Sequence, residues 1–269
     1  MYRIVRKEAL RPTVTLYEIE APLIAKKAQP GQFIILRTDE NGERIPITIN
    51  AYDPEKGTVT IIVQTVGATT VKLSHMKEGD CLADFVGPLG KPTETEGKKK
   101  VAVVGGGVGC AIAYPVLKKF HDDGAEVHAI VGFRSEDLVI LEDDFRKSSD
   151  LLVVCTDDGS YGRKGLVTDA LKELIEAGID AAIIAAPTAH HEAAALALAE
   201  AGVVSPLRRA GMTKANVRHV LASLEERFDL APGALMSAKP SFPCLAVYVP
   251  QGESITEASL REAARSRGL

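Results

Sequence analysis

The chain has 269 residues and a formal net charge of −4, and 46% of its residues are hydrophobic. This composition is typical of a globular protein, and the length suggests two domains. The acidic balance excludes the class of nucleic-acid-binding proteins, which usually carry a basic excess. No apolar run approaches the ~20 residues of a membrane-spanning helix, and the N-terminal stretch lacks the apolar core of a signal peptide. We therefore expect a cytoplasmic protein that makes no membrane contact.

Four cysteines lie far apart in the sequence: Cys81, Cys110, Cys155 and Cys244. None of them forms a CxxC pair, so their spacing indicates neither a zinc site nor a disulfide framework. Single buried thiols are the default in a reducing compartment. We therefore expect no metal site.

Residues 1–95 have the pattern of a small all-β domain. Short segments rich in β-branched residues are separated by Gly, Pro and Asp turns, at 13–21, 32–38, 44–53, 58–66 and 80–88. Five or six short strands at this spacing predict a six-stranded antiparallel β-barrel. One helix is expected to interrupt the barrel after Gly67.

The polar stretch 92–100 predicts a linker, because the pattern changes after it. Apolar strands then alternate with helical segments, which predicts an α/β domain over 100–200 with a parallel sheet covered on both faces. The fold class is therefore a two-domain α/β protein, with the barrel first. Residues 201–269 carry helical patterns but no chemical motif, and we treat them as a separate C-terminal tail.

A glycine-rich turn, in the stretch VAVVGGGVGCAIAYP, separates the first strand of the α/β part from a helix expected near Val108. Glycines such as Gly105, Gly107 and Gly109 let the backbone approach a phosphate, and the helix N-terminus offers free N–H groups. The dinucleotide fingerprint GxGxxG is incomplete, because Cys110 stands in place of the third glycine. The turn is either a nucleotide site or a plain tight turn.

A second candidate is the charged stretch that follows the third parallel strand. Asp157 and Asp158 lie at the carboxyl end of this strand, where ligands bind in open α/β sheets. Their carboxylates could hold ribose hydroxyls, and Arg163 and Lys164 could meet a phosphate. The alternative is a charged surface turn.

The β part contains a strand with an unusual combination of side chains. Arg44, Pro46 and Thr48 share one face of the strand RIPITI, because side chains alternate along a strand. A cation there can neutralise a diphosphate, and the hydroxyl can bond a planar heterocycle. The alternative is a surface arginine beside a half-buried strand.

A helix start in the β part is a further candidate. Gly67 precedes Thr69 and Thr70 there, and the free amides and hydroxyls could cradle an anion. The alternative is simple N-capping by Thr69 or Thr70.

Taken together, these motifs resemble those of ferredoxin-NADP reductase-like proteins. The motifs occur in the order seen in that superfamily: PGQF (30–33), RIPITI (44–49), QTVGATT (64–70), GPLGKP (87–92), GGGVGCAIAYP (105–115), GFRSEDL (132–138) and DDGSYGRKGLVTDAL (157–171). More closely, the set resembles the electron-transfer (iron–sulfur flavoprotein) subunits of dihydroorotate dehydrogenase. It is also similar to the small subunits of NADH-dependent ferredoxin:NADP oxidoreductases, also called sulfide dehydrogenase β subunits. The resemblance covers about residues 1–185.

The resemblance implies two cofactor sites. FAD would lie across the barrel, in contact with Arg44, Pro46, Ile47, Thr48, Gly67, Thr69 and Thr70. NAD(H) or NADP(H) would lie on the α/β domain as substrate, in contact with Gly105, Gly107, Gly109, Cys110, Arg134, Asp157 and Asp158. The flavin performs the hydride chemistry itself, so we name no catalytic residue. Arg134 and Ser135 could accept a 2′-phosphate, whereas Glu136 and Asp137 would repel one, which leaves the choice of nucleotide open.

The sequence departs from this family in its C-terminal part. The family binds a [2Fe–2S] cluster through four cysteines there, whereas only Cys244 follows residue 155 in this sequence. We therefore expect no cluster.

Three functions stay open. The first is an FAD-dependent oxidoreductase subunit that takes hydride from NAD(P)H and passes electrons to a larger flavoprotein or dehydrogenase subunit, or to a ferredoxin-like carrier. The second is a stand-alone flavin or ferredoxin reductase, and the third is a non-catalytic regulatory relative.

Overall fold

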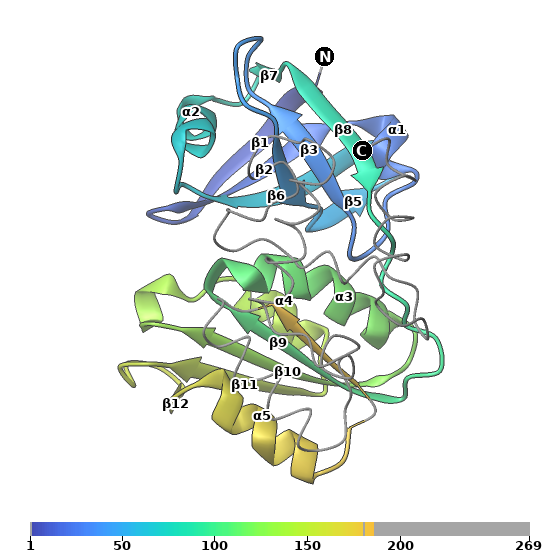
Figure 1. Ribbon diagram of the computed structural model, residues 1–269, viewed down its shortest axis with the longest axis vertical. Helices are drawn as coiled ribbons and strands as arrows, with labels where there is room; N and C mark the ends of the chain where they lie inside the picture. The colour runs from blue at the N-terminus through green and yellow to red at the C-terminus, as the bar shows by residue number, and fades with distance from the viewer. Residues whose placement is uncertain (1, 180, 186–269) are drawn as a thin grey trace, which may run out of the picture. The chain divides into compact units, whose positions relative to one another are not determined.

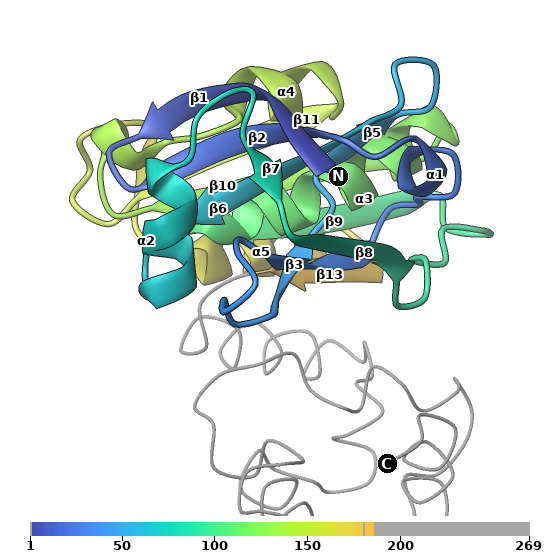
Figure 2. The same ribbon diagram turned by 90° about the horizontal axis from the view of Figure 1, so that it is seen from above.

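The computed structural model describes residues 2–179 and 181–185 (Figures 1 and 2). The expected tail over 201–269, the end of the expected nucleotide-binding domain and Cys244 lie outside the described residues. No helix within the described ranges is long and apolar enough to cross a membrane.

The N-terminal part consists of two antiparallel sheets. One has the order β5-β6-β2-β1-β7 and the other the order β4-β3-β8. The strands are β1 (Tyr2–Arg11), β2 (Val14–Glu20), β3 (Phe33–Arg37), β4 (Ile45–Thr48), β5 (Ala51–Asp53), β6 (Thr58–Gln64), β7 (Cys81–Leu82) and β8 (Asp84–Leu89). Two helices accompany them, α1 (Pro22–Ala25) and α2 (Ala68–His75).

These eight strands arise from six extended stretches of chain. The stretch β4–β5 leaves one sheet and joins the other at Ile49 and Asn50, and β7–β8 does the same at Ala83. The N–H of Ile49 bonds the carbonyl of Gln32 beside β3, whereas the N–H of Asn50 bonds Thr60 in β6. The six stretches match the predicted count. The sequence pattern did not mark β1, because charged residues interrupt its apolar ones.

Alternating residues of the strands serve two different cores. In β6, Val59, Ile61 and Val63 join the barrel core around the fully buried Tyr17 and Phe85. The intervening Ile62 packs instead with residues of the α/β part, as Val14 of β2 also does. Both faces of β6 are therefore covered, which explains the unbroken apolar run Ile61–Val63 within it.

The second part is a parallel sheet with the order β12-β11-β10-β9-β13. Its elements are β9 (Lys100–Gly106), a 3₁₀ turn η1 (Gly107–Gly109), α3 (Cys110–Asp122), β10 (Glu126–Phe133), η2 (Glu136–Leu138), α4 (Glu142–Lys147), β11 (Leu151–Thr156), β12 (Arg163–Lys164), α5 (Val167–Glu176) and β13 (Ala181–Ala185). Helices α3 and α4 cover one face of the sheet and α5 covers the other (Figure 1). The predicted alternation of strands and helices is confirmed.

Some details differ from the prediction. Strand β9 includes the first two glycines of the expected turn and ends at Gly106, and α3 begins at Cys110 after the 3₁₀ turn rather than near Val108. The short strand β12 was not predicted, since two residues carry no periodic pattern.

Candidate functional site

The glycine-rich turn lies where the strand order of the parallel sheet reverses. Strand β9 lies between β10 and β13, because the chain moves from it to β10 on one side and finally returns to β13 on the other. In open α/β sheets, ligands bind outside the carboxyl ends of the strands at such a switch point. Gly105, Gly107 and Gly109 therefore occupy the position that favours a nucleotide site over a plain turn.

The local packing of this turn explains two of its small residues. A Cβ atom at Gly105 would lie 2.8 Å from Sγ and 3.0 Å from Cα of Cys110, so no larger residue fits there. Gly107 has a φ of +54° and open space around the position of a Cβ, which leaves its backbone approachable. Gly109 is the N-cap of α3, and no side chain within the described part of the chain caps this helix.

Cys110 begins α3 and is fully buried. Burial raises the pKa of its thiol far above the ordinary value, so the sulfur stays protonated at physiological pH. This environment supports a packing role and does not suit a nucleophile.

The loops after β10 and β11 are joined to each other. The N–H groups of Asp157 and Asp158 bond the carbonyls of Phe133 and Arg134 at 3.0 and 3.2 Å. The Ser160 hydroxyl donates to Asp158 at 2.7 Å and accepts the N–H of Glu136 at 2.9 Å. Hydrogen bonds from Ser160 hold the pKa of Asp158 below its ordinary value, so this carboxylate is ionised at neutral pH.

Arg134, Asp157 and Asp158 are all exposed at this edge of the sheet, as the sequence predicted. Arg163 has a different environment, because Glu173 of α5 binds its guanidinium through two contacts of 2.7 Å. This pairing supports the structural alternative for Arg163 rather than phosphate binding.

On the β side, Arg44 precedes β4, which is an edge strand of its sheet. The edge position explains how Pro46 is tolerated within the strand. Nη2 of Arg44 lies 2.7 Å from Oδ2 of Asp84 in β8, and Nε of Arg37 lies 2.8 Å from the same oxygen. Neither contact has the alignment of a hydrogen bond, so both are ion pairs. The sequence reasoning missed Asp84 and Arg37, because only the pairing of β8 with β3 brings them to Arg44.

Arg44 remains available to a ligand, since 60% of its side chain is exposed. Pro46 beside it is also exposed, and Ile47 and Thr48 are half-buried. These residues together offer a cation next to a flat, partly apolar strand.

The N-terminus of α2 is the second feature on the β side. Gly67 is its N-cap, and the Thr70 hydroxyl accepts the N–H groups of Val66 and Gly67 at 2.9 Å each. Neither threonine is the N-cap itself: Thr70 supports the helix start from the third helical position, and Thr69 is buried. No atom lies within 4 Å of the position a Cβ would take at Gly67, so the backbone is open to a ligand at this point.

A buried hydrogen bond joins the two candidate regions. Nδ2 of Asn50, two residues after Thr48, donates to the carbonyl of Ala111 at 2.9 Å. Ala111 follows Cys110 in the first turn of α3, and Val14 and Ile62 of the barrel pack in the same cluster as both residues. The structure therefore links the strand that carries Thr48 to the glycine turn. No local pattern marks Asn50 in the sequence, because its partner lies 61 residues away.

The architecture of antiparallel sheets followed by this parallel sheet defines the ferredoxin-NADP reductase-like superfamily. No family model matches the chain. It is similar to a solved structure of an NADH-dependent reduced ferredoxin-NADP oxidoreductase, with 38% identity and a TM-score of 0.69 over 74% of this chain and 72% of the other.

Curated relatives identify the family within this superfamily. The chain is 46% identical over 171 residues to the dihydroorotate dehydrogenase B electron transfer subunit homolog of Thermotoga maritima, covering 64% of this chain. It is 32% identical over 222 residues to the dihydroorotate dehydrogenase B (NAD(+)) electron transfer subunit of Shouchella clausii, covering 80% of this chain and 78% of the relative. The chain belongs to the family of these electron transfer subunits.

The extent of these matches differs between relatives. The chain spans only 60% of the length of the Thermotoga maritima protein. The motifs had suggested that the resemblance covers only about residues 1–185. The Shouchella clausii match covers 80% of the chain, so it extends beyond that range.

Proposed function

We propose that the chain is an FAD-containing electron-transfer subunit that takes hydride from NADH and passes electrons to a larger flavoprotein or dehydrogenase subunit. The observation that carries this proposal is the Asn50–Ala111 hydrogen bond, which joins the candidate flavin strand to the glycine turn at the switch point. Hydride transfer between two ring systems requires such neighbouring sites.

The residues present on the β side fit an FAD molecule. The exposed guanidinium of Arg44 would neutralise the diphosphate, and the open backbone at Gly67 would approach it. Pro46, Ile47 and Thr48 would lie along the flavin ring, and Thr70 would order the helix start near the phosphates. We also place the buried Thr69 in this site, where it would support the turn.

FAD, when bound, would supply the chemistry, since the flavin ring accepts a hydride from a reduced nicotinamide. The chain's own part is to bind and orient. Gly105, Gly107 and Gly109 would let the nucleotide approach the N-terminus of α3, and Cys110 would fill the space beneath the turn. No acid or base is assigned, because hydride transfer needs none.

The loops after β10 and β11 favour NADH over NADPH. Glu136, Asp137, Asp157 and Asp158 place four carboxylates in these loops, against the two cations of Arg134 and of Lys164, whose charge acts on Asp158. A 2′-phosphate would meet net negative charge there, whereas ribose hydroxyls can donate to the carboxylates of Asp157 and Asp158.

We keep the domain division as part of this proposal, with FAD on 1–95 and the nucleotide on 100–200. It is supported by the change from antiparallel to parallel pairing between β8 and β9. We also propose that these 269 residues hold no iron–sulfur cluster, because they contain only four dispersed cysteines.

The visible absorption spectrum of the purified chain tests this function, before and after anaerobic addition of NADH or NADPH. We expect flavin bands near ~375 and ~450 nm that bleach faster with NADH, as a bound flavin should. A colourless chain that FAD cannot reconstitute would indicate the non-catalytic alternative. Rapid turnover with free flavin or ferredoxin in the absence of a second subunit would indicate the stand-alone reductase. A broad absorption beyond the flavin bands would contradict the absence of a cluster.

A further inference from the structure

Helix α3 contains a proline in its interior, and this proline frees a carbonyl group. Pro115 is the sixth residue of α3 and is buried. In an α-helix the N–H of residue 115 would bond the carbonyl of Ala111, but proline has no N–H to donate. Ala111 is itself buried, so its carbonyl needs another donor.

Asn50 supplies this donor from the barrel. Its Nδ2 lies 2.9 Å from the Ala111 carbonyl oxygen, and the residue is only 5% exposed. The backbone around it is held on both sides, because Ile49 bonds Gln32 and Asn50 bonds Thr60. The amide therefore projects from a rigid corner, where the chain passes from one sheet of the barrel to the other.

We propose that Asn50 is a positioning residue that sets the distance between the flavin strand and the nicotinamide-binding turn. The inference rests on the proposed function. Asn50 lies two residues beyond Thr48, and its partner Ala111 directly follows Cys110. A shift at this contact moves the glycine turn relative to β4, and hydride transfer is steeply sensitive to the separation of the reacting atoms. Because Pro115 has no N–H, the Ala111 carbonyl has no donor within the helix, and its hydrogen bond comes from Asn50 of the barrel.

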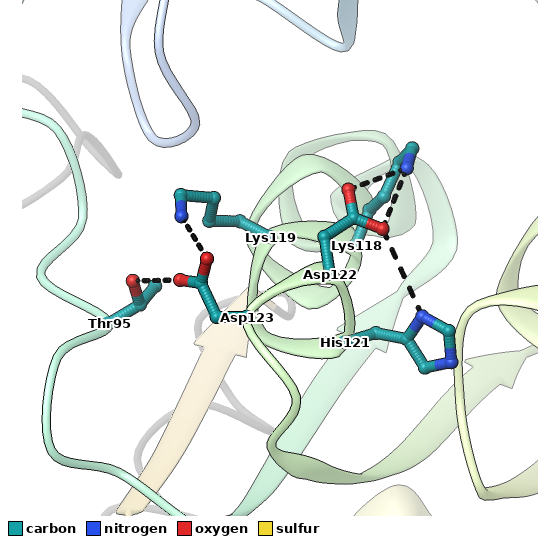
Figure 3. Close-up of polar contacts among 6 residues, drawn as sticks. All are labelled: Thr95, Lys118, Lys119, His121, Asp122 and Asp123. Carbon is teal, nitrogen blue, oxygen red and sulfur yellow. Dashed lines mark hydrogen bonds and ion pairs between the residues drawn. The ribbon is translucent and has the colours of Figure 1, made fainter.

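A second contact holds the opposite end of α3 and offers a matched control. The Thr95 hydroxyl, in the linker between β8 and β9, donates to Oδ2 of Asp123 at 2.7 Å (Figure 3). Asp123 also pairs with Lys119, so it keeps a partner when Thr95 is changed. Thr95→Val therefore removes one hydrogen bond onto the same helix, at the end away from the glycine turn.

A double-mutant cycle in the cofactor-free chain tests the contact itself. Asn50→Ala should lower the melting temperature by about 3–8 °C, because it leaves a buried carbonyl without a donor. In a Pro115→Ala background the new N–H of residue 115 bonds this carbonyl. Asn50→Ala should then lower the melting temperature by less than half as much as in the wild-type background. Equal losses in both backgrounds would show that Asn50 and the carbonyl freed by Pro115 are not coupled.

The reduction rate of the FAD-loaded chain tests the positioning role. Asn50→Ala should slow bleaching of the flavin by NADH about 10-fold or more, while the dissociation constant for FAD stays within about 2-fold. Thr95→Val should leave the rate within about 2-fold despite its loss of stability. Should Asn50→Ala alone fail to fold, the double variant with Pro115→Ala, in which the carbonyl has a donor, carries the rate measurement.

The possible results separate this inference from the proposed function. A wild-type rate in Asn50→Ala, or an equal slowing in Thr95→Val, would overturn the positioning role while leaving the reductase intact. A wild-type chain that binds no FAD would overturn the proposed function and the positioning role together. The melting cycle would still decide whether the contact is formed.

Discussion

Asp84 lies between two arginines, with its Oδ2 atom 2.7 Å from Nη2 of Arg44 and 2.8 Å from Nε of Arg37. Arg44 is mostly exposed, whereas Arg37 and Asp84 are about four-fifths buried. The carboxylate therefore holds Arg44 against β8 and offsets part of its charge. An anionic ligand must compete with Asp84 for the same guanidinium.

Removing this competitor should strengthen the binding of FAD. Asp84→Asn leaves both arginines without their anion, so the diphosphate should bind about 2- to 5-fold more tightly at low salt, as expected for a partly exposed ion pair. Quenching of flavin fluorescence on titration into the cofactor-free chain measures the dissociation constant. The gain should disappear at about 1 M salt, where charges are screened beyond ~3 Å.

The control is Asp122→Asn on α3, which removes an equal charge from a surface pair with Lys118. It should leave the affinity for FAD unchanged. Weaker FAD binding in Asp84→Asn would contradict this prediction. It would mean that Asp84 helps FAD binding by orienting Arg44 more than it hinders binding by competing for the guanidinium.

The two glycines of the turn should respond differently to the same substitution. Gly105→Ala places a methyl group against the sulfur and Cα of Cys110, and should lower the free energy of unfolding by about 2–4 kcal/mol. Gly107→Ala meets no neighbour but must adopt a positive φ, and should cost only about 1 kcal/mol. Urea denaturation of both variants measures the difference.

The affinity for NADH should show the opposite order: Gly107→Ala should weaken NADH binding more than Gly105→Ala does, provided that both variants fold. Gly107→Ala puts a methyl group on the open side of the turn, where the nucleotide would approach, so it should weaken NADH binding more than its small stability cost suggests. An unchanged affinity in Gly107→Ala would place the nucleotide elsewhere.

The buried thiol of Cys110 should resist chemical modification. Its pKa is raised by burial, so it presents no thiolate, whereas Cys81 is exposed. Treatment of the native chain with iodoacetamide at pH 8, followed by mass spectrometry of peptides, should find Cys81 labelled and Cys110 unlabelled. Cys110→Ala should keep the rate of flavin reduction by NADH within about 3-fold, because the sulfur takes no part in the chemistry. A rate loss of 100-fold would contradict the packing role.

The pKa of Asp158 should depend on Ser160. Two hydrogen bonds from Ser160, through its hydroxyl and its N–H, hold this pKa below the ordinary value. Ser160→Ala removes the hydroxyl bond and should raise the pKa of Asp158 toward its ordinary range, which an NMR titration of the carboxyl carbon can follow. Because the folded-state pKa is depressed, the stabilisation is present above the unfolded pKa of ~3.9 and is lost as the pH falls through the folded value.

Glu136 provides an internal check of this prediction, since its N–H bonds the same hydroxyl. In Ser160→Ala the amide proton of Glu136 should exchange faster with solvent. An unchanged pKa of Asp158 together with fast exchange would show that the N–H of Ser160 alone maintains the carboxylate.

Periodicity was sufficient to predict most of the fold. The apolar strands of the parallel sheet and the glycine turn follow from local patterns, because β9 and β10 are buried on both faces and the strands are flanked by turn residues. The position of the charged loops could be predicted as well, since the carboxyl ends of parallel strands meet at one edge. Asp157 and Asp158 lie there as expected.

Contacts between distant segments could not be predicted in this way. Nothing in the neighbourhood of Asp84 distinguishes it from other charged strand residues, and its role emerges only when β8 pairs with β3. The same holds for Ile62, whose side chain packs in the core of the α/β part rather than in the barrel core, and for Asn50. These relationships depend on which strands pair and which faces meet, and single-sequence patterns carry no such information.

The proline in α3 also bears on how the molecule holds together during unfolding. The helix cannot satisfy the Ala111 carbonyl from within itself, and the apolar cluster around Cys110 is completed by Val14 and Ile62 of the barrel. A fragment restricted to the α/β part would expose both the polar defect and the apolar face to solvent. The two parts should therefore melt as one cooperative unit. Either part expressed alone should be less stable than it is within the whole chain.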